Sequence, residues 1–246
     1  MPPDRVAELG AARERVLARI ADACARVSRD PAGVTLVAVT KTVPAERVRA
    51  AVQAGLTTLG ENRVQEAESK AVAVTGATWH LVGPLQSNKA KRALATFSTI
   101  QSVDSVALAA RLDRLVEEGS AAPPYQVLLQ VNVDRDPAKS GFDPDGLAGV
   151  LDDLAALDHL DVRGLMTVGR LVERAEDARP TFAALRELSG RLRAGSTGLG
   201  PELSMGMTDD FEVAVEEGAT IVRVGRALFG ERPHGHDHEG AAGHRH

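Results

Sequence analysis

The chain has 246 residues, of which 43% are hydrophobic and 26% charged, and its formal net charge is −5. This composition is typical of a folded globular protein and, with a single cysteine, excludes both wholesale disorder and a small disulfide-stapled scaffold. The mildly acidic charge and the aromatic content of 3% also argue against binding of nucleic acid.

The first predicted element is an amphipathic helix. Apolar residues recur between Val6 and Val27 at spacings of three and four, which is the period of a helix with one buried face. The run VTLVAVTK, from Val34 to Lys41, is short and rich in β-branched residues. Such a run is typical of a strand that is buried on both faces of a parallel sheet. A second helical segment follows and ends at Gly55.

This alternation of a strand-like run and a helix-like run continues along the chain and gives eight units. The predicted strands end near residues 41, 61, 82, 102, 132, 165, 204 and 224. Eight such units predict an α/β protein with a single (β/α)8 TIM barrel, to which the first helix is an addition. The rival, an open doubly wound sheet, usually carries GxGxxG after its first strand, and this sequence has no such motif there.

The composition changes after Pro233. Segment 234–246, HGHDHEGAAGHRH, holds five of the seven histidines and no large apolar residue. We therefore expect a barrel domain over residues 1–233 and a disordered His-rich tail over residues 234–246. A flexible tail offers no fixed ligand shell, so the sequence predicts no structured metal site.

The location of the protein is predicted from three absences in the sequence. No stretch approaches the ~20 apolar residues that cross a bilayer, and the N-terminal residues lack the apolar core of a secretory signal. Cys24 is the only cysteine, so no internal disulfide can form. We expect a cytoplasmic protein that contacts no membrane and, because no broad apolar stripe is evident, a monomer.

Lys41 is the first candidate functional residue. In a TIM barrel the active residues gather at the carboxyl ends of the strands, and Lys41 ends an otherwise apolar run. A lysine that is desolvated there has a lowered pKa, and its neutral amine can form a Schiff base with a carbonyl compound. The alternative is a lysine that merely reaches solvent at the end of the strand.

Small residues and hydroxyls follow the seventh and eighth strands, in SMGMT and VGRA. Many barrels bind phosphate at these two loops. Gly206 and Gly225 would let backbone N–H groups approach phosphate oxygens, although glycines can also serve only to make tight turns. An amine and a phosphate site in one barrel mouth suggest an aldehyde-bearing phosphate ester, either pyridoxal 5′-phosphate or a sugar phosphate.

Arg223 is expected to point inward from the last strand. A guanidinium can only donate to a pyridine nitrogen, which would keep the nitrogen unprotonated and make the ring a poor electron sink. The alternative is an ion pair between Arg223 and a local carboxylate such as that of Glu61.

Several motifs then carry a resemblance to a known family. In chain order they are VAVTK, GEN, VQEA, WHLVGPLQSNKAK, SVD, VNV, KSG, RGLMTV, LSMGMTDDFEVAVEEG and VRVGRALFG. Over about residues 5–233 the chain resembles the pyridoxal phosphate homeostasis proteins (YggS/PROSC), which are barrels similar to the N-terminal domain of alanine racemase. It departs from their pattern at Arg63, where tyrosine is often found, and at Thr208, where serine is common.

The resemblance implies a set of cofactor-binding residues. Lys41 would carry pyridoxal 5′-phosphate as an internal aldimine, Asn62 would lie beside the ring, and Arg223 would contact the pyridine nitrogen. The phosphate would be held by Ser204, Thr208, Gly225 and the backbone near Arg226, with Gly206 added by the loop pattern, while His80 and Met166 would line the pocket.

Two functional classes remain open on the sequence. A racemase needs a second proton-transfer group opposite the lysine, which in alanine racemase is a tyrosine, and the C-terminal domain of that enzyme helps to build the site. Here the chain ends soon after the eighth unit, and its only tyrosine, Tyr125, begins the fifth strand. We therefore expect a protein of pyridoxal phosphate homeostasis and delivery without efficient catalysis. A pyridoxal-phosphate-dependent amino-acid racemase is the first alternative, and a Schiff-base aldolase is the second.

The expected partners are pyridoxal-phosphate-dependent apo-enzymes or the enzymes that synthesise the cofactor. Lys89, Lys91 and Arg92, just after the third strand, can be a second weak phosphate site or simply a solvated helix face.

Overall fold

The strands form one closed parallel barrel. In the computed structural model, which describes residues 3–170, 172–196 and 198–230, each strand pairs with the next and β8 closes the ring against β1. The strands are β1 (Thr35–Val39), β2 (Thr58–Glu61), β3 (Thr78–Leu81), β4 (Thr99–Val103), β5 (Tyr125–Gln130), β6 (Leu160–Met166), β7 (Glu202–Ser204) and β8 (Ile221–Val224). The predicted (β/α)8 barrel is confirmed, and every strand ends within two residues of its predicted end. The predicted tail, residues 234–246, lies outside the described residues.

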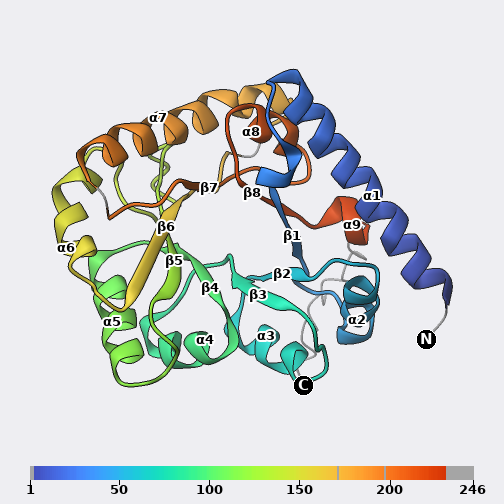
Figure 1. The fold of residues 1–246 in the computed structure, drawn as a ribbon, viewed down its shortest axis with the longest axis horizontal. Coiled ribbons are helices and arrows are strands. Elements are labelled where there is room, and N and C mark those ends of the chain that lie inside the picture. Colours follow the sequence, from blue (N-terminus) through green and yellow to red (C-terminus); the bar gives the residue numbers. More distant parts are fainter. Residues whose placement is uncertain (1–2, 171, 197, 231–246) are drawn as a thin grey trace, which may run out of the picture.

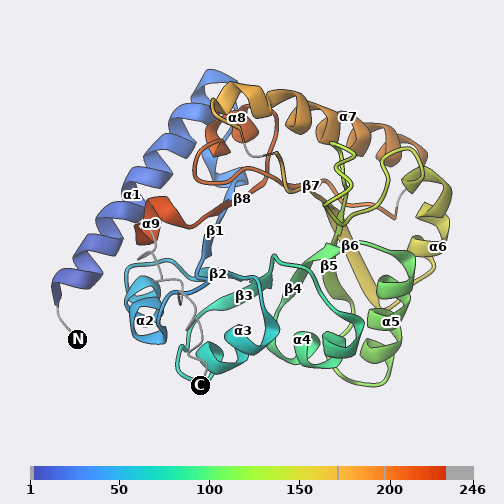
Figure 2. The same ribbon diagram turned by 180° about the vertical axis from the view of Figure 1, so that it is seen from behind.

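The helices surround the ring of strands (Figure 1). They are α1 (Pro3–Arg26), α2 (Ala45–Gln53), α3 (Val64–Ala71), α4 (Ala90–Thr96), α5 (Val106–Glu117), α6 (Leu151–Ala155), α7 (Arg179–Gly195), α8 (Phe211–Glu216) and α9 (Arg226–Phe229). Short 3-10 turns are η1 (Pro31–Gly33), η2 (Ser87–Lys89), η3 (Leu147–Val150) and η4 (Ala175–Ala178). The predicted additional helix is α1, which packs along α8, α9 and α2, as the reverse view in Figure 2 also shows.

Two separate apolar clusters stabilise the fold. The larger one fills the space between the strands and the surrounding helices. The smaller one consists of Val37, Leu128, Met166 and Ile221, with Val82 packed against it. Because it is separate from the first, this second cluster lies inside the barrel, beside the polar groups described below.

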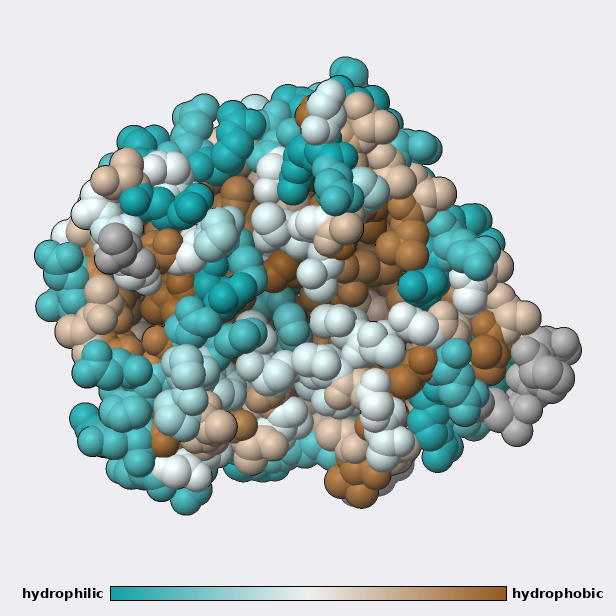
Figure 3. Space-filling model, in the orientation of Figure 1, coloured by the Kyte–Doolittle hydropathy of each residue, from teal (hydrophilic) through white to brown (hydrophobic). Residues whose placement is uncertain are grey.

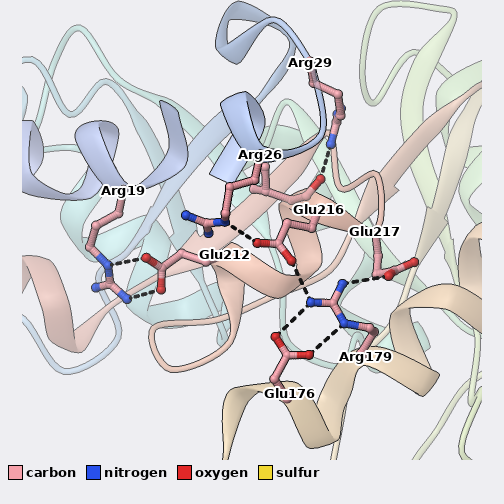
Figure 4. Close-up of polar contacts among 9 residues, drawn as sticks. Arg19, Arg26, Arg29, Glu176, Arg179, Glu212, Glu216 and Glu217 are labelled. Atoms are coloured by element: carbon pink, nitrogen blue, oxygen red, sulfur yellow. Dashed lines mark hydrogen bonds and ion pairs between the residues drawn. The ribbon is translucent and has the colours of Figure 1, made fainter. Parts of the chain in front are cut away.

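The short helix α8 is fixed between α1 and α7 by ion pairs (Figure 4). Arg19 of α1 binds Glu212 at 2.8 Å, and Arg26 of α1 binds Glu216 at 2.6 Å. From the other side, Arg179 of α7 also binds Glu216, at 2.6 Å. These contacts hold both ends of α8, with Glu212 in its first turn and Glu216 at its last residue.

Hydrophilic residues cover much of the face shown in Figure 3, with apolar groups visible between them. None of the helices in the described part of the chain is long and apolar enough to cross a membrane. The described residues also contain no group of three or more His, Cys, Asp or Glu side chains that could hold a metal ion.

Candidate functional site

A chain of hydrogen bonds crosses the interior of the barrel. Arg223 Nη1 donates to Ser204 Oγ at 2.7 Å, and Ser204 Oγ donates to Gln101 Oε1 at 2.6 Å. Gln101 Nε2 then lies 2.8 Å from Nδ1 of His80. The chain links four strands, β8, β7, β4 and β3, and its Ser204–Gln101 bond joins β7 to β4, which are not paired in the sheet.

The direction of this chain determines the tautomer of His80. The amide oxygen of Gln101 accepts from Ser204, so its NH₂ group faces the histidine and donates to Nδ1. The proton of the neutral ring is therefore on Nε2. Burial lowers the pKa of His80 from 6.5 to about 4, so the imidazole is neutral at physiological pH.

Arg223 is enclosed by the barrel, with only 5% of its surface exposed. Its Nη2 donates to the carbonyl of Thr167 at 2.7 Å. Burial lowers the pKa of Arg223 to about 10, and the charge of Asp210 opposes this shift. The guanidinium therefore stays protonated at neutral pH.

Glu61 is not the partner of Arg223, contrary to one of the two alternatives left open by the sequence. It is the neighbour of Gly60, whose missing Cβ would lie 2.8 Å from Val37 inside the barrel. Since successive residues of a strand face opposite sides, Glu61 faces outward, where its Oε1 accepts a hydrogen bond of 2.6 Å from Lys70 of α3.

Lys41 lies in the turn that follows β1 and is half-buried. Thr40, just before it, continues the ladder by donating its N–H to the carbonyl of Gly60 at 2.9 Å. Thr42, just after it, has a φ of 66°, a left-handed conformation that is unusual for a β-branched residue. The backbone thus leaves the strand abruptly at the lysine.

Asn62 lies directly after β2, half-buried, beside the end of β3. A Cβ on Gly83 would lie 2.5 Å from the carbonyl oxygen of Asn62. Only glycine at residue 83 allows the two chain segments to approach so closely. Met166, at the end of β6, is fully buried in the apolar cluster inside the barrel and lies level with Ser204 of β7.

The loops after β7 and β8 lie side by side. Gly206 has a φ of 89°, and an added Cβ would lie 2.5 Å from that of Ala214. Thr208 Oγ1 lies 3.4 Å from the backbone N of Gly225, and a Cβ on Gly225 would lie 3.4 Å from the carbonyl oxygen of Val39 in β1. These loops are therefore next to the Lys41 turn.

Arg226 is exposed at the start of α9 and forms an ion pair with Asp209. This pair ties the loop after β8 to the loop after β7. The structure thus brings most of the predicted site residues to one end of the barrel, from β1, β2, β6, β7 and β8. His80 lies within β3 rather than after its end, and it is half-buried.

Sequence reasoning missed two groups. Gln101, which links Ser204 to His80, is a buried glutamine in a run of β-branched residues, and such a residue needs hydrogen-bond partners. Lys70 was also missed, although it follows Glu66 at a spacing of four, which is a helical ion-pair signal. In the predicted basic cluster of Lys89, Lys91 and Arg92, the arginine is already paired with a carboxylate, that of Glu68 on α3.

Comparisons with known proteins agree with the barrel fold. Residues 15–233 match the family model described as alanine racemase, N-terminal domain. A pyridoxal phosphate homeostasis protein of Pseudomonas aeruginosa is 42% identical over 223 residues, covering 90% of this chain and 94% of the relative. The protein of the same name from Aquifex aeolicus is 41% identical over 220 residues, covering 89% and 96%.

Among solved structures, PipY of Synechococcus elongatus with PLP bound is 42% identical, with a TM-score of 0.76, covering 86% of this chain and 100% of that one. Alanine racemase from Corynebacterium glutamicum is 18% identical, with a TM-score of 0.70, covering 95% of this chain and 64% of that one. At that identity the second likeness concerns the fold alone.

Proposed function

This chain belongs to the family of pyridoxal phosphate homeostasis proteins, and we propose that it binds pyridoxal 5′-phosphate reversibly at the barrel mouth. The cofactor is held by a Schiff base with Lys41 for intracellular homeostasis and delivery, without efficient catalysis by the protein itself. The observation that carries this proposal is that the Lys41 turn, Arg223 and the two glycine-containing loops lie at one end of the barrel.

The residues present fit the three functional groups of the cofactor. Lys41 supplies an amine, which can condense with the aldehyde and release water. Arg223 has five N–H donors, and its two terminal nitrogens are each bound to one protein oxygen, so further donors remain for a pyridine nitrogen. When bound, the cofactor supplies an electrophilic carbon and a conjugated ring.

The phosphate is assigned to the loops after β7 and β8. Thr208 supplies a hydroxyl, and Gly206 and Gly225 let the backbone come close to a bound anion. Ser204, at the end of β7, is fully buried and already bonded to Arg223 and Gln101, so we assign it to orienting the guanidinium. Asn62 and Met166 form the walls, and the exposed Arg226 lies at the rim.

The arrangement offers a poor second base, which supports storage rather than racemisation. Tyr125, the only tyrosine, begins β5 at the opposite end of the barrel and donates to the carbonyl of Phe97 at 2.6 Å. His80 lies within β3, and its Nδ1 is bound to Gln101. Two-base chemistry at a substrate carbon needs a group within hydrogen-bond reach, and neither residue is placed at the mouth.

The first test is an absorption spectrum of purified protein titrated with pyridoxal 5′-phosphate. We expect a visible Schiff-base band that disappears on borohydride reduction, and a peptide covering Lys41 that carries the reduced adduct. Lys41→Ala should show no such band, whereas Lys91→Ala, which changes an exposed lysine of α4, should retain the band. A wild type without the band would refute the proposal.

Transfer and turnover need separate assays. We expect loaded protein to restore activity to a pyridoxal-phosphate-dependent apo-enzyme, and we expect no efficient conversion of L- or D-amino acids by the protein. Robust racemisation that is lost in Lys41→Ala would replace the storage role with that of a racemase. We expect the protein to act as a monomer, which sedimentation analysis can check.

A further inference from the structure

A buried ion cluster lies directly behind the Lys41 turn. It consists of Lys70 and Glu66 of α3 and Glu61 of β2. Glu61 is fully buried and Lys70 is 5% exposed. Ions are expensive to bury unless they are paired and hydrogen-bonded, so the presence of three ionisable groups here calls for a role beyond filling space.

All three N–H donors of the Lys70 ammonium are used. Nζ lies 2.6 Å from Glu61 Oε1, 2.7 Å from Glu66 Oε1 and 2.7 Å from the backbone carbonyl oxygen of Thr40. A saturated, buried ammonium of this kind is not available as a nucleophile. Lys70 therefore does not compete with Lys41 for an aldehyde.

The same cluster binds the backbone on both sides of Lys41. On one side, the carbonyl of Thr40 accepts a hydrogen bond from Lys70, and the hydroxyl of Thr40 donates to Glu61 Oε1 at 2.6 Å. On the other side, the N–H of Thr42 donates to Glu66 Oε1 at 2.6 Å. The Thr40 carbonyl belongs to the peptide plane that precedes the Lys41 Cα, and the Thr42 N–H belongs to the peptide plane that follows it.

These contacts also explain how the unusual backbone of Thr42 is maintained. A left-handed β-branched residue is strained and persists only where its surroundings hold it in place. The carboxylate of Glu66 contributes to this by accepting the Thr42 N–H, beside the backbone hydrogen bond of 2.9 Å from the Val43 N–H to the Thr40 carbonyl. Although burial raises the pKa of Glu66, the hydrogen bonds from Lys70 and Thr42 lower it overall, so the carboxylate is charged at neutral pH.

We propose that Lys70, Glu61 and Glu66 position Lys41: they fix the two peptide planes that flank its Cα, and so direct its amine into the barrel mouth. This inference rests on the proposed function, because it concerns how the amine reaches the aldehyde. None of the three side chains is assigned a contact with the cofactor. Their effect is on the rate of Schiff-base formation rather than on recognition of the ring or the phosphate.

The test separates these two effects with two ligands. Pyridoxal 5′-phosphate forms the Schiff base, whereas pyridoxine 5′-phosphate has the same ring and phosphate but no aldehyde. For Lys70→Met we expect the rate of Schiff-base formation at saturating pyridoxal 5′-phosphate to fall at least about tenfold, because small misplacements of a reacting group are costly. The dissociation constant for pyridoxine 5′-phosphate should stay within about twofold of the wild type.

A second set of variants keeps the test decisive if Lys70→Met fails to fold. Glu66→Ala removes the acceptor of the Thr42 N–H but leaves the Lys70–Glu61 pair, and its side chain is 26% exposed. We expect slow Schiff-base formation in Glu66→Ala and substantial recovery in Glu66→Gln, which retains an oxygen acceptor. Glu68→Ala, on the same helix but paired with Arg92, is the matched control and should react at the wild-type rate.

Schiff-base formation at the wild-type rate in both Lys70→Met and Glu66→Ala would overturn the positioning role. So would a parallel loss of affinity for pyridoxine 5′-phosphate, since that would show general damage to the pocket. A wild type that binds pyridoxine 5′-phosphate but forms no Schiff base, or binds neither ligand, would instead refute the proposed function. The two failures are therefore distinguishable.

Discussion

The guanidinium of Arg223 and the hydroxyl of Ser204 are bonded at 2.7 Å inside the barrel, where Ser204 is fully buried. The serine both accepts from the arginine and donates to Gln101, so its single hydroxyl proton has one defined direction. Hydrogen bonds in a chain polarise one another. Through Ser204, the position of Arg223 therefore depends on a glutamine of β4, which lies across the barrel from β8.

Removal of the Ser204 hydroxyl should therefore cost more than one ordinary hydrogen bond. Ser204→Ala leaves a donor on Arg223 and an acceptor on Gln101 without their partner, and unsatisfied buried groups cost about 1–3 kcal/mol each. We expect the free energy of unfolding, measured by urea denaturation, to fall by about 2–4 kcal/mol.

A double-mutant cycle with Gln101→Leu identifies the cause of that loss. If the two residues act through one chain, the double variant should be more stable than the sum of the single losses predicts, by about 1 kcal/mol or more. Additive losses would show that Ser204 and Gln101 stabilise the barrel independently.

His80 should make the protein sensitive to acid. Burial lowers its pKa to about 4, whereas in the unfolded chain the imidazole titrates near its usual value of about 6.5. As the pH falls from about 6.5 to about 4, His80 binds a proton in the unfolded state but stays neutral in the folded state. The stability present above pH 6.5 is thus progressively lost toward pH 4, by up to about 3 kcal/mol.

His80→Gln isolates this contribution, because glutamine retains an acceptor for Gln101 but does not titrate. The stability of the wild type relative to His80→Gln should decline as the pH is lowered from 7 to 4, measured by denaturant unfolding at each pH. Parallel stability curves for the two proteins would contradict the assignment of a neutral, partly buried histidine.

The sequence predicted the architecture well because the strand signal is local. Strand-like runs alternate with helix-like runs along the chain, and the position of Lys41 or Ser204 near a strand end follows from that alternation. Which side chains meet across the barrel is a different matter, because it depends on strand tilt and on register. The shift in register between Ile100 and Val103, where β4 pairs with β5, is not visible in the sequence.

Glu61 is an example of a side chain whose partner could not be predicted from its position at a strand end. Its position at the end of β2 suggested a carboxylate that could face Arg223, but the face of a strand changes with every residue. Gly60 takes the inward position, and Glu61 turns to Lys70 outside the barrel. The Glu66–Lys70 spacing was a readable signal for an ion pair, although nothing in it indicated that the pair would reach the backbone of Thr40 and Thr42.

Gly206 should be intolerant of even the smallest side chain. Its φ of 89° disfavours other residues, and an alanine Cβ would meet Ala214 at 2.5 Å. Gly119 is the matched control, since it has a φ of 82° but nothing within 4 Å of an added Cβ. We expect Gly119→Ala to cost about 1 kcal/mol of stability through backbone strain, and Gly206→Ala to cost about 1–3 kcal/mol more through the clash.

The same variant tests the assignment of the phosphate loop. Movement of the loop away from α8 should weaken the binding of pyridoxine 5′-phosphate in Gly206→Ala, while Gly119→Ala should bind it normally. Equal stability and equal affinity in the two variants would show that the loop after β7 adapts freely and is not a preformed anion site.

Arg179 provides the last prediction, because its contribution should depend on both salt and pH. It is bonded to Glu176, Glu216 and Glu217 at once (Figure 4). The site is partly solvated, so we expect Arg179→Met to lose only about 1 kcal/mol of stability at low ionic strength, and less in 1 M NaCl. Arg191→Met, at an exposed position of the same helix, should show no such dependence.

The pH dependence of Arg179→Met follows from the carboxylates. The hydrogen bond from Arg179 is the main reason that the pKa of Glu216 lies below its usual 4.5. A depressed carboxyl pKa stabilises the folded state above the unfolded value, and this stabilisation is lost as the pH falls through the folded pKa. The gap in stability between the wild type and Arg179→Met should therefore narrow below about pH 4.5. A gap independent of pH and salt would mean that the arginine acts through the packing of its aliphatic stem against α8 rather than through its charge.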